Sequence, residues 1–392
     1  MTRFVPFAQG LRPFFLLAGV DAIFNMAVWL IVYFRPDLWP AAALPAMYWH
    51  GHEMIFGFIA AAIAGFLLTA VPGWTGRSSY AGVPLILLSA LWLAGRVAMF
   101  APLGVPPVLA AIIDLAFFPA LALSLTPPLV KARKIRNFPF PLLLLALFAA
   151  DLVFQLGSLG TLDMGEHISL SIAVDIISIL IVIVGGRIIP AFTKSGLARF
   201  RANLDLASSR TVEYMAIASI VAVLGGDLAA PLSQLNGAIA LAAGVLQALR
   251  LAQWQGYRTV REPLIWVLHL GYAWLALALL LKGIWLLAGC PIAEKWLHAL
   301  TVGAFATMIL AVMPRAALGH TGRPLAAPPS MAIGYLLLTV AALVRVFAPA
   351  LAPAHYGTEI VIAGACWIAA FGLFVVVYAP ILTRPRADHR SG

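Results

Sequence analysis

Long runs of apolar residues alternate with short polar segments along the whole chain, and this pattern predicts a helix bundle embedded in a membrane. A helix of about 20 apolar residues spans the hydrocarbon core of a bilayer, and the sequence contains about twelve such runs. They lie near residues 14–34, 48–71, 82–101, 106–128, 138–160, 167–190, 211–229, 233–252, 263–290, 294–316, 329–349 and 357–380. We therefore expect an all-α, polytopic membrane protein with a single transmembrane domain over residues 1–392.

The composition excludes a soluble globular protein. Hydrophobic residues make up 63% of the chain and charged residues 10%, with a mean hydropathy of +0.99, whereas a soluble domain is about half apolar and a quarter charged. The net charge of +10 comes from short clusters between the apolar runs, such as Lys131, Arg133, Lys134 and Arg136. No basic domain is large enough to bind a nucleic acid, so we attribute the charge to membrane topology.

The distribution of the 25 lysines and arginines predicts the orientation of the helices. If the N-terminus is cytoplasmic, all but five of these cations lie at or beyond cytoplasmic ends, as the positive-inside rule requires. The exceptions are Arg35, Arg96, Lys282, Lys295 and Arg345. We expect both termini in the cytoplasm and the chemistry among the helices or in short loops.

Two segments of the chain share a spaced pattern that indicates an internal repeat. Residues 52–77 and 298–323 both read H-x4-G-x17-T-G-R, at a constant offset of 246 (298 − 52 = 246 and 321 − 75 = 246). Identical spacing without a gap is typical of a duplication. Because eight predicted helices separate the two segments, the repeat is parallel, and both segments run from the outside inwards.

His52 and His298 begin the two repeat segments, about one helical turn below the predicted outer surface. Two imidazoles at equal depth on repeat-related helices are suited to bind the two axial positions of a haem iron. The alternative is that each histidine only donates a hydrogen bond to a backbone carbonyl at a helix interface.

Ionisable residues near these histidines predict a polar interior in the outer half of the bundle. Asp114, Asp151 and Asp175 lie about eight or nine residues from the outer ends of their spans, and Glu53 follows His52. Charges in hydrocarbon are costly and normally face a partner or water, so these four acids are candidates for a polar shell or a proton route. The alternative is structural pairing, for example of Arg96 or Lys282 with an aspartate.

Three other histidines are candidate ligands of copper or of a second redox centre: His50, His269 and His320. Imidazole binds either copper or iron. The competing interpretations are an aromatic belt for His50, an interior hydrogen bond for His269 and a solvated loop for His320.

Residues 72–77 and 185–190 are each expected to break a helix beside a cytoplasmic arginine. Arg77, Arg187 and Arg323 are therefore candidates to bind haem propionates or lipid phosphates. Plain anchoring at the cytoplasmic surface is the favoured interpretation of these arginines.

Several of these motifs together resemble the NnrS family. They are Leu-Arg-Pro-Phe-Phe-Leu at 11–16, His-Glu-Met at 52–54 with Ala-Gly-Phe-Leu-Leu-Thr-Ala at 64–70 and Trp-Thr-Gly at 74–76, Gly-Gly-Arg at 185–187 with Pro190 and Phe-Thr at 192–193, and Leu-Gly-His-Thr-Gly-Arg at 318–323. The resemblance covers essentially the whole chain. It implies a bacterial inner-membrane protein of about twelve helices that carries haem b and copper and is linked to nitric oxide metabolism and resistance to nitrosative stress.

The expected layout is also similar to the core of the haem-copper oxidases, in which the second and tenth helices bind a low-spin haem. His52 and His298 match that arrangement. The chain departs from it because span seven contains no histidine and span ten contains one where the oxidases use two. An oxidase-type binuclear centre is therefore not expected, nor are oxygen reduction and proton pumping.

The leading hypothesis is a haem protein that binds or reduces nitric oxide, with a quinol or a cytochrome as a candidate electron donor. A bis-histidine haem has no open position for a gas, so this hypothesis needs a displaceable ligand or a second centre. The alternative is a secondary transporter, which also uses repeats and intramembrane charges. A third hypothesis is a cofactor-free chaperone or assembly factor.

Overall fold

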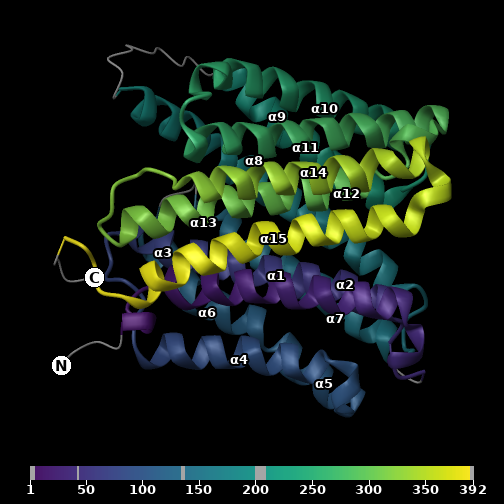
Figure 1. The fold of residues 1–392 in the computed structure, drawn as a ribbon, viewed down its shortest axis with the longest axis horizontal. Helices are drawn as coiled ribbons and strands as arrows, with labels where there is room; N and C mark the ends of the chain where they lie inside the picture. The colour runs from purple at the N-terminus through teal and green to yellow at the C-terminus, as the bar shows by residue number, and fades with distance from the viewer. Residues whose placement is uncertain (1–4, 42–43, 134–136, 199–208, 389–392) are drawn as a thin grey trace. The chain divides into compact units, whose positions relative to one another are not determined.

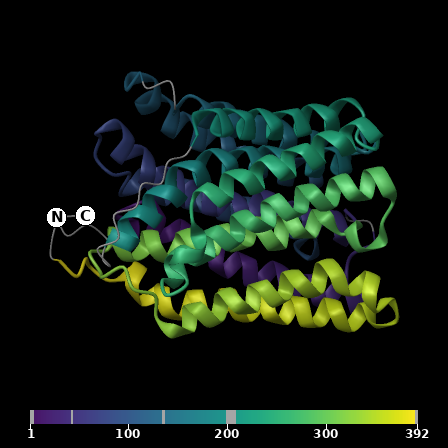
Figure 2. The ribbon, with the colours of Figure 1, turned by 90° about the horizontal axis from the view of Figure 1, so that it is seen from above.

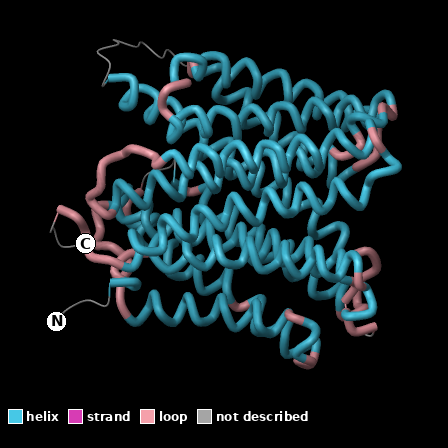
Figure 3. Tube along the Cα trace, viewed as in Figure 1, coloured by secondary structure: helices cyan, strands magenta, loops and turns pink. Residues whose placement is uncertain are grey.

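The structure is a computed structural model that describes residues 5–41, 44–133, 137–198 and 209–388. Within these ranges the chain forms helices and loops and no strand (Figure 3). Lys134 and Arg136, which belong to the predicted cytoplasmic cluster, lie outside the described residues. The all-α prediction is confirmed.

Among the described residues, eleven helical segments are long and apolar enough to cross a membrane. They are α1 (Leu11–Phe34), α2 to α3 (Ala46–Thr75), α5 and α6 (Pro107–Lys131), α7 (Pro139–Ser158), α8 (Gly165–Leu197), α9 (Arg210–Ala229), α10 (Gln234–Gln253), α11 (Pro263–Ala288), α12 to α13 (within Pro291–His320), α14 (Pro329–Leu351) and α15 (Tyr356–Thr383, within Pro353–Thr383). A further apolar helix, α4 (Val83–Met99), has 17 residues, a length within the range of transmembrane helices. Each predicted span thus has a helix, and the chain is a multi-pass membrane protein.

The side chains are arranged as a bilayer requires. Large apolar side chains such as Leu123 and Val376 are about three-quarters exposed, at 75% and 74%, whereas His52 and Asp114 are buried. Exposed apolar surface of this extent is typical of helices that face lipid.

The chain forms two compact units. The first contains Met1–Ala173, Ala316–Pro324 and Phe374–Gly392, and the second Val174–Arg315 and Leu325–Leu373. In the first unit α1 packs against α3, α4 against α5, and α6 against α7 (Figure 1). In the second unit α10 packs against both α9 and α11 (Figures 1 and 2).

A π-helix follows the histidine in each of the two repeat segments. The segment η3 (Glu53–Ile59) begins directly after His52, and η9 (Ala299–Ala306) begins directly after His298. The two π-helices begin at the same offset as the sequence pattern (299 − 53 = 246). π-Helical turns are rare and occur frequently at functional sites, so both histidines lie where the helix geometry is unusual.

The two segments also end in the same way. Gly76 and Gly322 adopt left-handed conformations, with φ of 71° and 70°, which favour glycine because a Cβ would be strained there. The threonine before each glycine donates its hydroxyl to a backbone carbonyl: Thr75 Oγ1 to Val71 O at 2.8 Å, and Thr321 Oγ1 to Ala317 O at 2.6 Å. The arginine after each glycine donates its backbone N–H in the same way: Arg77 N to Pro72 O at 3.1 Å, and Arg323 N to Leu318 O at 3.0 Å. Every matched pair again differs by 246 positions, so the sequence pattern and the local backbone geometry agree.

The expected helix break at residues 185–190 is not present in α8 (Gly165–Leu197). The helix continues through Gly185, Gly186 and Pro190 to Leu197, so residues 185–190 do not break it. A proline removes one backbone hydrogen bond, a loss that neighbouring helices in a membrane protein can compensate. Here Tyr272 and Arg250 pack directly against the two glycines and support the helix at this point.

Candidate functional site

Four buried ionisable side chains of the first unit gather around a fifth, His52. His52 is the last residue of α2, Glu53 begins η3, Arg96 lies on α4, and Asp114 and Asp151 lie on α5 and α7. We call these five residues the His52 cluster. His52 is 0% exposed, and the other four are at most 9% exposed, so the cluster is shielded from the surroundings of the unit.

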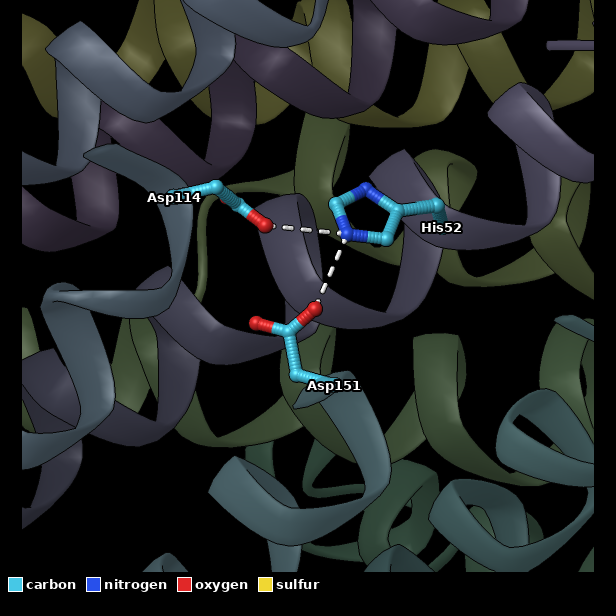
Figure 4. Close-up of side chains that lie close together, drawn as sticks. All are labelled: His52, Asp114 and Asp151. Atoms are coloured by element: carbon cyan, nitrogen blue, oxygen red, sulfur yellow. Dashed lines mark hydrogen bonds and ion pairs between the residues drawn. The ribbon is translucent and has the colours of Figure 1, made fainter. Parts of the chain in front are cut away.

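Both ring nitrogens of His52 face carboxylates. Nδ1 lies 3.0 Å from Glu53 Oε1, and Nε2 lies 3.1 Å from Asp114 Oδ2 and 3.2 Å from Asp151 Oδ1 (Figure 4). One donor atom from each of His52, Asp114 and Asp151 lies within 4.8 Å of the others. These three residues could therefore share a single ion.

Arg96 and Gln155 orient the carboxylates of the cluster. Arg96 Nη1 donates to Glu53 Oε1 at 2.8 Å, and Nη2 forms an ion pair with Asp114. Gln155 Nε2 donates to Asp114 Oδ2 at 2.9 Å. Each contact holds an acidic side chain in place, as partners of ligands do around metal sites.

Gly57, the glycine of the H-x4-G pattern, makes room for this arrangement. A Cβ at Gly57 would lie 2.9 Å from Arg96 Nη1 and 2.9 Å from Asp21 Oδ2. Trp92 Nε1 also donates to the Gly57 carbonyl, at 3.2 Å. The glycine thus allows Arg96 and Asp21 to approach the backbone of the π-helix.

The cluster and its neighbour Asp21 contain more negative charge than positive charge. Asp21, Glu53, Asp114 and Asp151 supply four carboxyl groups, and Arg96 supplies one guanidinium. Asp21 Oδ2 is buried and has no hydrogen-bond partner among the described residues. Unbalanced charge is costly away from water, so the cluster favours bound protons or a bound cation.

The donors fit a metal ion. Imidazole nitrogen and carboxylate oxygen bind first-row metals at about 2.0–2.2 Å, so neighbouring donors around one ion lie about 3.0–3.5 Å apart. The separations of 3.1 and 3.2 Å at His52 Nε2 agree with this range. A haem iron instead needs an imidazole nitrogen that faces the macrocycle, whereas this nitrogen faces Asp114, Asp151 and, at 3.4 Å, Gln155 Nε2. The arrangement around His52 therefore suits an ion better than a haem.

Asp175 has other neighbours than the two aspartates with which it was grouped. It belongs to the second unit, where Asp227 and Lys282 are its charged neighbours. Lys282 forms an ion pair with Asp227, and Asn236 donates to the same carboxylate at 2.6 Å. The structural pairing considered for Arg96 and Lys282 is thus present at both residues.

The remaining predicted histidines have different surroundings. His298 is half-buried at the end of α12 in the second unit, and its pairing with His52 stays a prediction.

The three candidate copper ligands also have separate surroundings. His50 stacks on Trp29, with ring centroids 4.7 Å apart. His269 Nε2 lies 2.9 Å from Thr193 Oγ1, within hydrogen-bond distance, and the exposed His320 accepts a bond from Arg386 through its carbonyl at 2.8 Å. Over the described ranges, His52, Asp114 and Asp151 are the one group of three donors close enough to share a metal ion.

The three predicted arginines differ in exposure. Arg77 is exposed, and Arg323 is half-buried and donates to Thr321 O at 3.3 Å. Arg187 is half-buried and lines a cavity of the second unit. Their binding to propionates or lipid stays a prediction.

Gln155 belongs to the site but was not among the predicted site residues. It lies four residues after Asp151 on α7 and therefore shares its face of the helix. This spacing was a usable signal. The approach of Asp21 to Arg96 had no such signal, because it joins helices that are distant in the sequence.

The comparison with known proteins agrees with this arrangement of motifs. No curated protein matches the sequence. A family model described as NnrS protein matches residues 5–386, a range that includes both repeat segments and every residue of the His52 cluster. The chain belongs to the NnrS family.

Proposed function

We propose that this membrane protein holds a metal ion between His52, Asp114 and Asp151 and uses it to bind or reduce nitric oxide. The observation that carries the proposal is the approach of three buried donor atoms to within 4.8 Å of one another. Membership of the NnrS family supports the link to nitric oxide. The charge excess of the cluster supports a cation rather than a neutral ligand.

The chain's own residues would hold and orient the ion. Glu53 accepts a hydrogen bond from His52 Nδ1. Because Nδ1 then carries the proton, the lone pair of Nε2 points towards Asp114 and Asp151. Arg96 and Gln155 hold Asp114. Copper or iron bound there would supply a coordination position for nitric oxide.

Glu53, Asp114 and Asp151 are also the proposed proton route. Reduction of nitric oxide consumes protons as well as electrons, and these carboxylates are buried beside the proposed ion. Asp175 with Asp227 is a separate candidate in the second unit. Proton transfer by buried carboxylates is typical of ionisable residues in membranes.

Haem b remains part of the proposal as a second cofactor, with His298 as its candidate ligand in the second unit. The matching π-helices and the matching helix ends support a repeat that contains both histidines. Ligation of haem by His52 would require Asp114 and Asp151 to move away from Nε2. We further propose that the protein lies in the bacterial inner membrane. A quinol or a cytochrome is the proposed electron donor.

Absorption spectra of the purified protein test this proposal. We expect the dithionite-reduced wild type to change its spectrum when nitric oxide is added, and His52→Ala and Asp151→Asn to lose most of that change. His167→Ala is the matched control, because His167 is exposed at the start of α8. A response that persists unchanged in both cluster variants would contradict the role of the site.

A secondary transporter is the second candidate, because a buried cluster of carboxylates with a histidine also suits proton or cation transport. A colourless wild-type protein that contains neither iron nor copper after haem- and metal-sufficient expression would favour this candidate. Proton or cation flux in proteoliposomes that is lost in His52→Ala would then establish it.

A further inference from the structure

The second unit contains a cavity of about 270 Å³ between α8, α9 and α10. Three arginines and one glutamate line it, together with apolar side chains and a glycine. The charged lining residues are Arg187, Arg210, Arg250 and Glu213. The positive-inside orientation predicts that this end of the helices faces the cytoplasm.

Arg250 is the most deeply buried charged residue of the cavity lining, and we call its position the floor of the cavity. Its side chain is 1% exposed and forms an ion pair with Glu213. Nη1 donates to Val182 O at 2.8 Å and to the Tyr272 hydroxyl at 2.7 Å, and the guanidinium lies 5.3 Å from the centre of the Trp254 ring. A buried arginine held by four partners is a fixed positive charge.

Gly186 allows Arg250 to occupy this position. A Cβ at Gly186 would lie 1.9 Å from Arg250 Nη2 and 2.8 Å from its Cζ. The neighbouring Gly185 gives the same freedom to the Tyr272 ring, which lies 3.1 Å from the position of a Cβ. The paired glycines before Arg187 therefore build the cavity floor, a function that the nitric oxide site does not explain.

The lining carries three guanidinium groups against one carboxylate, so its formal charge is positive. Ile183 and Ile217 supply an apolar wall, and Tyr214 is 73% exposed at the rim. Guanidinium groups bind phosphate through paired, charge-assisted hydrogen bonds. Basic cavities between transmembrane helices on the cytoplasmic side favour lipid head groups.

We infer that this cavity binds an anionic phosphate group, either the head group of an anionic phospholipid or free phosphate. Arg187 and Arg210 would contact the phosphate, and Arg250 would stabilise its charge from the floor. The apolar wall and Tyr214 would contact the adjoining part of a lipid. This site is independent of the His52 cluster.

Native mass spectrometry of the full chain in detergent, with phosphatidylglycerol or phosphatidylcholine added, tests the lipid source. Thermal unfolding in increasing inorganic phosphate, with chloride at equal ionic strength as the reference, tests the free anion. We expect preferential binding of phosphatidylglycerol or stabilisation by phosphate, and the arm that responds identifies the source. Arg187→Gln and Arg210→Gln should each weaken the response about tenfold, because each removes a charge-assisted hydrogen bond to the phosphate, and a tenfold change equals about 1.4 kcal/mol of binding free energy.

Two further variants test whether binding depends on the cavity itself. Gly186→Ala should weaken binding by displacing Arg250, whereas Arg258→Gln should leave it unchanged, because Arg258 is exposed and does not line the cavity. The inference is overturned if neither phosphatidylglycerol nor phosphate is preferred. It is also overturned if Arg187→Gln, Arg210→Gln and Arg258→Gln bind alike.

Discussion

At the residue scale, the His52 cluster depends on glycines as much as on charged side chains. Gly57 allows Arg96 and Asp21 to reach the π-helix, and Gly95 gives Asp114 similar room, since a Cβ there would lie 3.1 Å from Asp114 Oδ1. Burying several carboxylates together requires that each finds a donor. Close backbone approach lets Arg96 reach Glu53 and Asp114.

Gly57→Ala should therefore destabilise the protein. Its Cβ would meet Arg96 and Asp21, both of them held inside the first unit, and overpacking of this kind costs about 1–3 kcal/mol. We expect a lower midpoint of thermal unfolding in detergent and a weaker metal site.

Gly73→Ala is the matched control for Gly57→Ala. Gly73 lies in α3 and is exposed, and a Cβ added to it would have no described atom within 4 Å. An alanine there should stabilise the helix by up to about 1 kcal/mol. Equal effects of the two substitutions would contradict the packing role of Gly57.

The site could be predicted from the sequence only in part, for physical reasons. His52, Glu53, Asp114 and Asp151 are identifiable because an ionisable residue inside an apolar span needs a partner. Which residues become partners depends on helix packing, which periodicity does not encode. Asp175 illustrates this limit, because its predicted depth matches that of Asp114 and Asp151 while its charged neighbours are Asp227 and Lys282.

At the element scale, the apolar runs predicted every long helix, because span length follows from bilayer thickness. They did not predict the π-helices η3 and η9, since a single wide turn leaves the apolar pattern of the run unchanged. The glycines and Pro190 also suggested a break at residues 185–190, where α8 continues to Leu197. Both departures arise from local backbone geometry that neighbouring helices support.

The π-helix sets the direction of His52 relative to α3. Met54 is the one residue of η3 that is not buried, so its deletion should remove the wide turn with little loss of packing. When the turn tightens to α-helical geometry, the residues in it and beside it change direction, so Glu53 and the adjoining His52 should lose their positions beside Asp114 and Asp151. We expect normal helicity by circular dichroism and loss of bound metal.

Substitution of Met54 by alanine provides the control for the deletion. It shortens the same side chain and keeps the number of residues in η3. Metal content should stay near that of the wild type. Retention of metal by the deletion variant would refute the role of the π-helix.

At the scale of the whole molecule, each of the two compact units contains its own buried charge cluster. The first contains the His52 cluster, and the second contains Asp175, Asp227 and Lys282. The sequence predicted a polar interior but not its division between two units, because contacts between distant segments define the units.

The charge distribution predicts the orientation of the molecule, and cysteine labelling measures it. Cys290 is half-buried after α11, on the predicted outer side. A membrane-impermeant maleimide should label Cys290 in intact spheroplasts of a Cys366→Ala strain. Ser78→Cys, in a strain without both native cysteines, should be labelled only after permeabilisation. The reverse pattern would contradict the positive-inside assignment.

The most direct test of the account is the metal content of the purified protein, measured by inductively coupled plasma mass spectrometry. We expect about one ion of copper or non-haem iron per wild-type chain, and at most about a tenth of that in His52→Ala and Asp151→Asn. Haem iron is measured separately by the pyridine haemochrome method, and His167→Ala serves as the control. Wild-type metal content in both cluster variants, with their folds intact, would show that His52, Asp114 and Asp151 do not form the metal site.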